Sequence, residues 1–360
     1  MRAVASWNGP GRIHGIDLAR GLAVLGMLAA HLLWIDPFDW TRPATWIDVA
    51  NGRSSILFAT LAGVSIALVT GGASPVRGER LRRARRSLAV RAGLIWAIGV
   101  ALVFTGVPVF VILPAYGILF LLALPLLTLS APVLWAVAVA VALVVPWFVP
   151  MLNALPIWSS ALGSEASTLV GWHYPFPLWI AFVAAGLAIG RSRLRSAAVA
   201  VRLLVGGGAV AMVAYGLDAV AAERLSPVQD GSLVAQVWTA DAHSSGILEA
   251  FGSGGFAVAV IGLCLLLCRT PLTWLVLPVR AVGTMPLTAY AGQLVVWAIW
   301  AAGVLGDSGQ LAGFRDLDPF VPFVIGTLLV CTVWALLVGR GPLERLVAAV
   351  TRAVVGSGRR

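Results

Sequence analysis

An apolar segment near the start of the chain carries three ionisable residues, Asp17, Arg20 and His31. His31 follows Arg20 by 11 positions. On a helix this spacing is three full turns plus about 20°, so both side chains lie on one face. Along the helix axis the two residues are about 16 Å apart. Asp17, three residues before Arg20, lies on the same side. Imidazole exchanges protons near neutral pH, and guanidinium binds phosphates bidentately. The spacing is therefore compatible with a general base at one end of this face and an anion site at the other.

A structural explanation of the same residues remains open. Ionisable groups inside an apolar segment are costly, and by default they indicate a functional site. However, Arg20 could extend to lipid headgroups, and His31 could hydrogen-bond a neighbouring helix. The spacing alone does not separate these two interpretations.

The composition indicates which elements position these residues. Hydrophobic residues make up 60% of the chain and charged residues only 11%, whereas a soluble domain has about 25% charged residues. The apolar runs are long and do not alternate with polar residues, which favours membrane-spanning helices over a barrel. We expect an all-α, polytopic transmembrane helix bundle.

Ten apolar runs have a length suited to crossing a bilayer. We expect them to form a single integral membrane domain over residues 1–360. The predicted helices lie near 16–35, 54–71, 88–105, 108–129, 132–149, 175–190, 203–222, 247–268, 282–304 and 319–338.

The distribution of charge predicts the orientation. If the N-terminus lies inside and the loops alternate, all but four of the 25 basic residues, every one of them arginine, fall on the cytoplasmic side. The exceptions are Arg42, Arg53, Arg224 and Arg315. We therefore expect cytoplasmic N- and C-termini and a multi-pass protein of the bacterial cytoplasmic (inner) membrane. No basic face with interleaved aromatic residues is present, so nucleic acid is not an expected partner.

Two further groups of candidate residues lie in predicted extracytoplasmic loops. Asp241 and His243 precede the helix predicted at 247–268, and Glu249 lies in its first turn. His243 would join an active site, and Asp241 would orient it or an acceptor sugar. Glu249 could bind substrate or simply complement the helix dipole. His173 lies among aromatic residues that already explain an interfacial position.

Asn51 and Arg53 precede the helix predicted at 54–71. Arg53 breaks the charge rule locally and could hold a carboxylate or phosphate of an acceptor, although Asp48 offers an ordinary pairing. We take both residues as candidates for substrate binding.

Several segments resemble known families. RGLAVLGMLAAH, Arg20 to His31, resembles the Arg, ten residues, His signature of membrane-bound acyltransferases that O-acylate bacterial surface glycans. IDLARGLAVLGMLAAH with the later LFATLAGVSIAL is similar to the start of the heparan-alpha-glucosaminide N-acetyltransferase family. VGTMPLTAYAGQLVVWAIW and GPLERLVAAVTR resemble the YeiB-type bacterial membrane proteins, a family of unknown function numbered 418.

The resemblance implies an acyl-CoA-dependent O- or N-acyltransferase. It would move an acyl group, with acetyl expected, from cytoplasmic acyl-CoA to an extracytoplasmic glycan or lipid-linked sugar. His31, with His243 and Asp241, would be catalytic, and Arg20 with Asp17 would bind the donor. His31 would act as a general base or carry the acyl group itself.

The expected partners are membrane lipid and a glycan or glycolipid acceptor, and no metal is expected. A homo-oligomer is compatible with the sequence. The alternative function is a transporter or channel without chemistry, in which the Arg20 to His31 face lines the path. The sequence shows no internal repeat, which weakens that alternative.

Overall fold

The computed structural model describes residues 9, 11–224 and 232–356. Over these ranges it contains helices and no strand, so the predicted all-α bundle is confirmed. Seven helices are long and apolar enough to cross a membrane, and an eighth candidate is a pair bent by 52°. Two shorter apolar helices are also present. The terminal residues 1–8 and 357–360, for which we predict a cytoplasmic position, lie outside the described residues.

Each of the ten predicted ranges overlaps a helix. The helices are α2 (His14–Leu32), α3 (Arg53–Val69), α4 (Gly78–Val103), α5 (Leu113–Leu122), α6 (Ala131–Val144), α9 (Phe176–Gly190), α10 (Ala197–Arg224), α13 (Ile247–Leu267), α16 (Pro286–Leu305) and α18 (Phe320–Leu337). Shorter elements connect them: η1 (Pro43–Ala50), η2 (Pro125–Thr128), η3 (Val145–Trp147), α7 (Val149–Asn153), η4 (Pro156–Ser159), α8 (Ala161–Val170), α12 (Leu233–Val237), α14 (Leu272–Leu275), α15 (Leu277–Thr284) and α17 (Leu311–Arg315). A further helix, α19 (Pro342–Val355), follows α18.

Two helices differ from the predicted ranges for physical reasons. α4 begins ten residues before the predicted start at 88, because arginine forms helix well and hydropathy detects only the part of a helix inside lipid. The range 282–304 is divided between α15 and α16 at Met285, whose φ is −137°. Pro286 then occupies the first turn of α16, a position where its missing N–H costs nothing.

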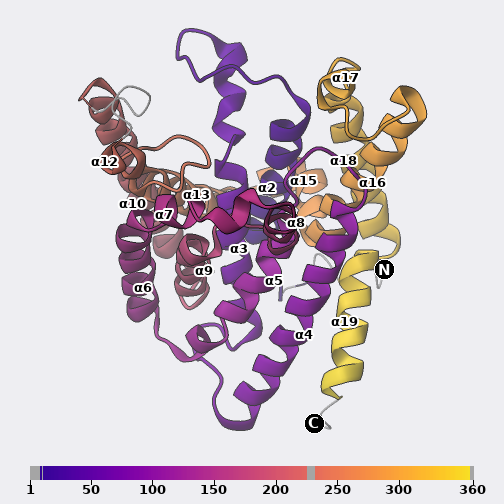
Figure 1. Ribbon diagram of the computed structural model, residues 1–360. Coiled ribbons are helices and arrows are strands. Elements are labelled where there is room, and N and C mark those ends of the chain that lie inside the picture. Colours follow the sequence, from indigo (N-terminus) through magenta and orange to yellow (C-terminus); the bar gives the residue numbers. More distant parts are fainter. Residues whose placement is uncertain (1–8, 10, 225–231, 357–360) are drawn as a thin grey trace.

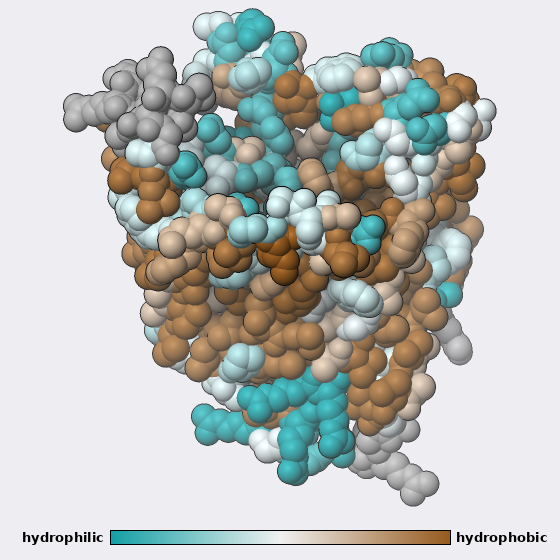
Figure 2. Space-filling view, in the orientation of Figure 1, coloured by the Kyte–Doolittle hydropathy of each residue, from teal (hydrophilic) through white to brown (hydrophobic). Residues whose placement is uncertain are grey.

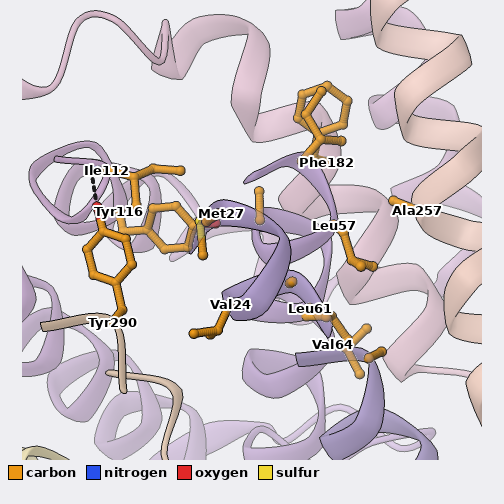
Figure 3. Packing of buried hydrophobic residues seen from close by; sticks show 14 of the residues in the cluster. Val24, Met27, Leu57, Leu61, Val64, Ile112, Tyr116, Phe182, Ala257 and Tyr290 are labelled. Carbon is orange, nitrogen blue, oxygen red and sulfur yellow. Dashed lines mark hydrogen bonds between the residues drawn. The ribbon is translucent and has the colours of Figure 1, made fainter. Parts of the chain in front are cut away.

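α2 lies at the centre of the bundle (Figure 1), in contact with α3, α13 and α15. One hydrophobic cluster includes residues of α2, α3, α5, α9, α13 and α16, and Figure 3 shows members from all six. The central helix that carries the candidate site is therefore fixed by packing from both halves of the chain.

The outer surface matches a membrane environment. On the face that Figure 2 shows, hydrophobic side chains form a broad band across the middle and lower part of the molecule, and hydrophilic side chains gather at the lower tip, where α4 begins. This part of α4 holds Arg80, Arg82, Arg83, Arg85 and Arg86. Arginines next to an apolar belt are typical of the cytoplasmic boundary and of contact with anionic headgroups.

Glu344 explains the GPLER motif structurally. Its Oε1 accepts hydrogen bonds from the backbone N–H groups of Leu287 (2.8 Å) and Thr288 (3.1 Å), and its Oε2 accepts one from the Thr288 hydroxyl. The first N–H groups of a helix have no partner within the helix. The carboxylate of α19 therefore caps the start of α16.

The close crossing of α3 and α9 gives a stability prediction. A Cβ on Gly63 would lie 2.1 Å from the carbonyl oxygen of Val183. Backbone atoms cannot move away as a flexible side chain can, so Gly63→Ala should lower the free energy of unfolding by about 1–3 kcal/mol. The matched control is Gly216→Ala in α10, where a Cβ would meet nothing within 4 Å. Thermal unfolding in detergent should show a lower midpoint for Gly63→Ala but not for Gly216→Ala. Equal midpoints for the two variants would contradict the close approach of α3 and α9 at Gly63.

Candidate functional site

Three histidines from separate segments line one cavity of about 230 Å³. His31 lies at the end of α2, His173 between α8 and α9, and His243 in the loop before α13. The centroids of the His173 and His243 rings are 5.3 Å apart. None of the three imidazoles hydrogen-bonds another described residue, so their nitrogens remain available to a ligand. Within the part of the chain that the structure describes, no group of three or more His, Cys, Asp or Glu residues could hold a metal ion.

The cavity lies at one end of the bundle. Its other lining residues come from the η1–α3 junction, the loop before α5, and α17. The charge pattern assigns all of these segments to the extracytoplasmic side. Tyr290 of α16 also lines the cavity, and its hydroxyl accepts a hydrogen bond from the backbone N–H of Ile112 (3.3 Å; Figure 3).

Glu249 holds the loop that carries His243. Its Oε1 accepts the backbone N–H of His243 and its Oε2 that of Ser245, both at 2.6 Å. His243 and Ser245 have φ values of 64° and 61°, a conformation that non-glycine residues adopt only when their surroundings compensate the strain. Glu249 is not among the residues that line the cavity, and its observed contacts hold the loop that carries His243.

The structure places Asn51 and Arg53 in different surroundings. Asn51 lines the cavity, and its Nδ2 donates to Asp48 Oδ1 (3.3 Å). Arg53 is not part of the lining: its Nε donates to the Tyr215 hydroxyl (2.7 Å), and its Nη1 donates to the Asp48 carbonyl (3.1 Å). Asp241 is exposed and also lies outside the lining. Of these three candidates, only Asn51 is therefore placed to meet a ligand beside His31.

The structure pairs Arg20 and Asp17 with each other. Arg20 Nη1 donates to Asp17 Oδ1 (3.0 Å), and Arg20 Nη2 donates to the Ser65 hydroxyl of α3 (2.9 Å). Arg12 donates to both oxygens of the same buried carboxylate at 2.9 Å. Two guanidinium groups thus share one carboxylate, which leaves a net positive charge at this end of α2.

A second cavity, of about 350 Å³, adjoins this ion-pair network. Its lining includes Arg12, His14, Arg195 and Arg269, all in segments that the charge pattern assigns to the cytoplasm. The lining contains no acidic residue. The two ends of α2 therefore open onto cavities of different chemistry, one rich in histidine and one rich in arginine.

Sequence reasoning missed the role of Arg315. Its Nε donates to the carbonyl oxygen of His31 (3.0 Å) and its Nη2 to that of Ala30 (3.2 Å), and Arg315 lines the histidine cavity. The signal was present, because Arg315 is one of the four arginines that break the charge rule. What the sequence lacks is the tertiary contact that brings α17 to the end of α2.

Packing of aromatic rings shifts the pKa of His173. The ring stacks on Phe110 with a centroid distance of 3.6 Å and an interplanar angle of 9°. Desolvation, followed by the nearby His243, lowers the pKa of His173 from 6.5 to about 4, although solvent still reaches part of the ring. Desolvation also lowers the pKa of His243. The His173 ring is therefore neutral at pH 7, and burial favours the neutral form of His243 as well.

This shift predicts acid sensitivity. Below pH 6.5 the unfolded chain binds a proton at His173 that the folded protein does not bind, so stability should fall as the pH decreases from 6.5 towards 4. We expect His173→Gln to lose less stability over that window than the wild type. The measurement is the unfolding midpoint against pH, with pH 7 to 9 as the internal control. Parallel curves between pH 6.5 and 4 would contradict the lowered pKa.

Comparison with known families decides the affiliation. Residues 12–215 match the family described as heparan-alpha-glucosaminide N-acetyltransferase, catalytic. The chain belongs to this family. Residues 211–353 match the family described as protein of unknown function, DUF418. The resemblances to these two families are thus confirmed, and the protein is a multi-pass member of a family of transmembrane acetyltransferases. No curated protein matches the chain, and the single domain expected over residues 1–360 stays a prediction.

Proposed function

We propose that this protein transfers an acyl group, acetyl in the first instance, from cytoplasmic acyl-CoA to a hydroxyl or amine of an extracytoplasmic glycan or glycolipid. The protein would act in the cytoplasmic membrane of a bacterium. The observation that carries the proposal is the convergence of His31, His173 and His243, with free imidazole nitrogens, on one cavity at the outer end of α2. Family membership supports acyl transfer as the reaction.

His31 is the group best placed for the chemical step. Its ring would take the proton from the acceptor O–H or N–H while the acceptor atom attacks the thioester carbon. The C–S bond then breaks, and the CoA thiolate leaves with the proton returned by His31. The products are the acylated acceptor and free CoA thiol, so atoms and charges balance. His173 and His243, whose neutral forms burial favours, would bind acceptor hydroxyls in the same cavity.

The arginine-lined cavity suits the donor. Arg12, Arg195 and Arg269 line it together, and guanidinium groups bind phosphates such as those of CoA. We assign donor binding to this cavity and not to Arg20 alone, because several arginines line the cavity and Arg20 is not among them. His14 at this cavity and His31 at the other are separated by 17 positions of α2, about 25 Å along the axis.

No described residue lines both cavities, so the acyl group would have to cross this distance along α2. In one route the extended arm of the donor reaches the acceptor directly. In the other, His31 receives the acyl group as an acyl-imidazole and passes it to the acceptor after CoA has left. Incubation with radiolabelled acetyl-CoA in the absence of acceptor separates the routes, because only the second leaves label on the protein.

The test of the function is turnover. Purified protein is reconstituted in vesicles with acetyl-CoA on one side and cell-envelope glycan on the other, and free thiol and acetylated glycan are measured together. We expect equal amounts of both products, formed only when both substrates are present. Movement of solute across the vesicle membrane without thiol release would contradict the proposal and favour a transporter.

A further inference from the structure

The histidine cavity contains a guanidinium group without an acidic partner. Arg315 makes no ion pair with any described residue, and the cavity lining includes no Asp or Glu. Its Nε and Nη2 each donate one hydrogen bond to carbonyl oxygens at the end of α2, and its guanidinium lies 4.9 Å from the centroid of the Trp34 ring. The cation is thus held in place by its α2 contacts and by the aromatic ring.

One edge of the guanidinium remains open. The Nε–Nη2 edge faces the carbonyls of His31 and Ala30, whereas Nη1 makes no hydrogen bond with any described residue. Nη2 carries a second N–H, so Nη1 and Nη2 together present the parallel donors that match a carboxylate or phosphate.

The electrostatics of the cavity favour an anion. The C-terminal end of α2 carries a partial negative charge of about half a unit, which offsets only part of the guanidinium charge. Burial lowers the pKa of the Arg315 guanidinium. The carboxylate of the adjacent Asp316 accepts a hydrogen bond from the indole N–H of Trp34 (3.4 Å) and makes no ion pair with Arg315. A partly buried charge without a counterion is unfavourable, so a bound anion would complete the site.

We propose that the acceptor is an anionic glycan whose carboxylate or phosphate binds Arg315 beside His31. The proposal rests on the acyltransferase function and names the class of its acceptor. The ring that carries the anion would lie in the cavity, and its hydroxyl or amine would face the imidazole of His31. Acidic sugars and sugar phosphates share the chemistry that Arg315 recognises.

The competing explanation is that Arg315 only caps α2. Arginine side chains do hydrogen-bond the last carbonyl groups of helices. To cap α2, Arg315 needs only the hydrogen bonds that Nε and Nη2 donate to the helix carbonyls, and no ligand. To bind an anion, Nη1 and Nη2 must also donate hydrogen bonds to that anion. The two explanations therefore differ in whether an anion stabilises the folded protein.

The experiment measures the unfolding midpoint in detergent with methyl β-glucuronide, glucose 6-phosphate or uncharged methyl β-glucoside. We expect one or both of the charged probes, but not the glucoside, to raise the midpoint of the wild type. Arg315→Gln should abolish this shift. Arg315→Lys keeps the positive charge but lacks the two parallel N–H donors of a guanidinium, so it should retain part of the shift. The matched control is Arg42→Gln, because Arg42 is another outer arginine but is exposed and pairs with Asp39 (3.0 Å).

Each outcome bears on the proposal. A charged probe that stabilises wild type and Arg42→Gln but not Arg315→Gln supports it, and the more effective probe identifies carboxylate or phosphate. Failure of both charged probes, or a shift that survives in Arg315→Gln, overturns it. Because the midpoint needs no turnover, this result is independent of whether thiol is released. In the transfer assay, Arg315→Gln should raise KM for an acidic acceptor at least tenfold and leave KM for acetyl-CoA unchanged.

Discussion

Replacement of His31 by alanine should lower the rate of acyl transfer by about 10²–10⁴-fold, the usual contribution of a general base. His31 lies at the end of the central helix and lines the cavity with a free imidazole. The measurement is the rate of thiol release from acetyl-CoA with saturating acceptor.

The control separates chemistry from folding. His31→Asn keeps a polar side chain of similar size but cannot take up a proton, so it should unfold at nearly the wild-type midpoint and be as slow as His31→Ala. Free imidazole added to His31→Ala should restore part of the rate if the cavity admits it. Wild-type turnover by both variants would show that the proton is taken by another group.

Arg191→Gln should reduce the free energy of unfolding by about 3 kcal/mol or more, because it leaves several buried carbonyl groups without a donor. Arg191 is 6% exposed and lies at the end of α9. Its Nη1 donates to the carbonyls of Thr70 (3.2 Å) and Gly72 (2.9 Å), and its Nη2 donates to that of Leu127 (2.6 Å). One side chain thus joins the ends of α3, η2 and α9.

Arg193 offers a matched control two residues away. It is exposed, so Arg193→Gln should leave the free energy of unfolding within about 0.5 kcal/mol of the wild-type value. The comparison uses denaturation in the same detergent and the same assay for both variants. A similar loss in the two variants would mean that the charge of this loop, and not the buried hydrogen bonds, sets the stability.

The positions of the helices could be predicted because hydropathy is a local property. A run such as residues 247–268 is apolar whatever its neighbours are, and α13 coincides with that range almost to the residue. A break inside an apolar run is not visible to hydropathy. The division of 282–304 at Met285 stands directly before Pro286, because a proline disfavours helical backbone at the residue before it.

The site could be predicted only in part, because its residues come from distant segments. His31 was accessible through its spacing from Arg20, but the approach of His173 to His243 depends on how the loops before α9 and α13 fold over the cavity. Glu249 appeared as a polar residue in a first turn, and only its two short hydrogen bonds show that it holds a strained loop. Likewise, the pairing of Arg20 with Ser65 requires α3 beside α2.

The cap that Glu344 places on α16 has a consequence for biogenesis. Tyr290, a wall of the histidine cavity, lies one turn beyond the residues that Glu344 binds. The ribosome delivers His31, His173 and His243 long before Glu344, and segments fold in the order of their synthesis. A nascent or truncated chain will therefore contain all three histidines while the start of α16, one turn before Tyr290, still lacks the cap that Glu344 provides. We expect the cavity to reach its final form late in assembly.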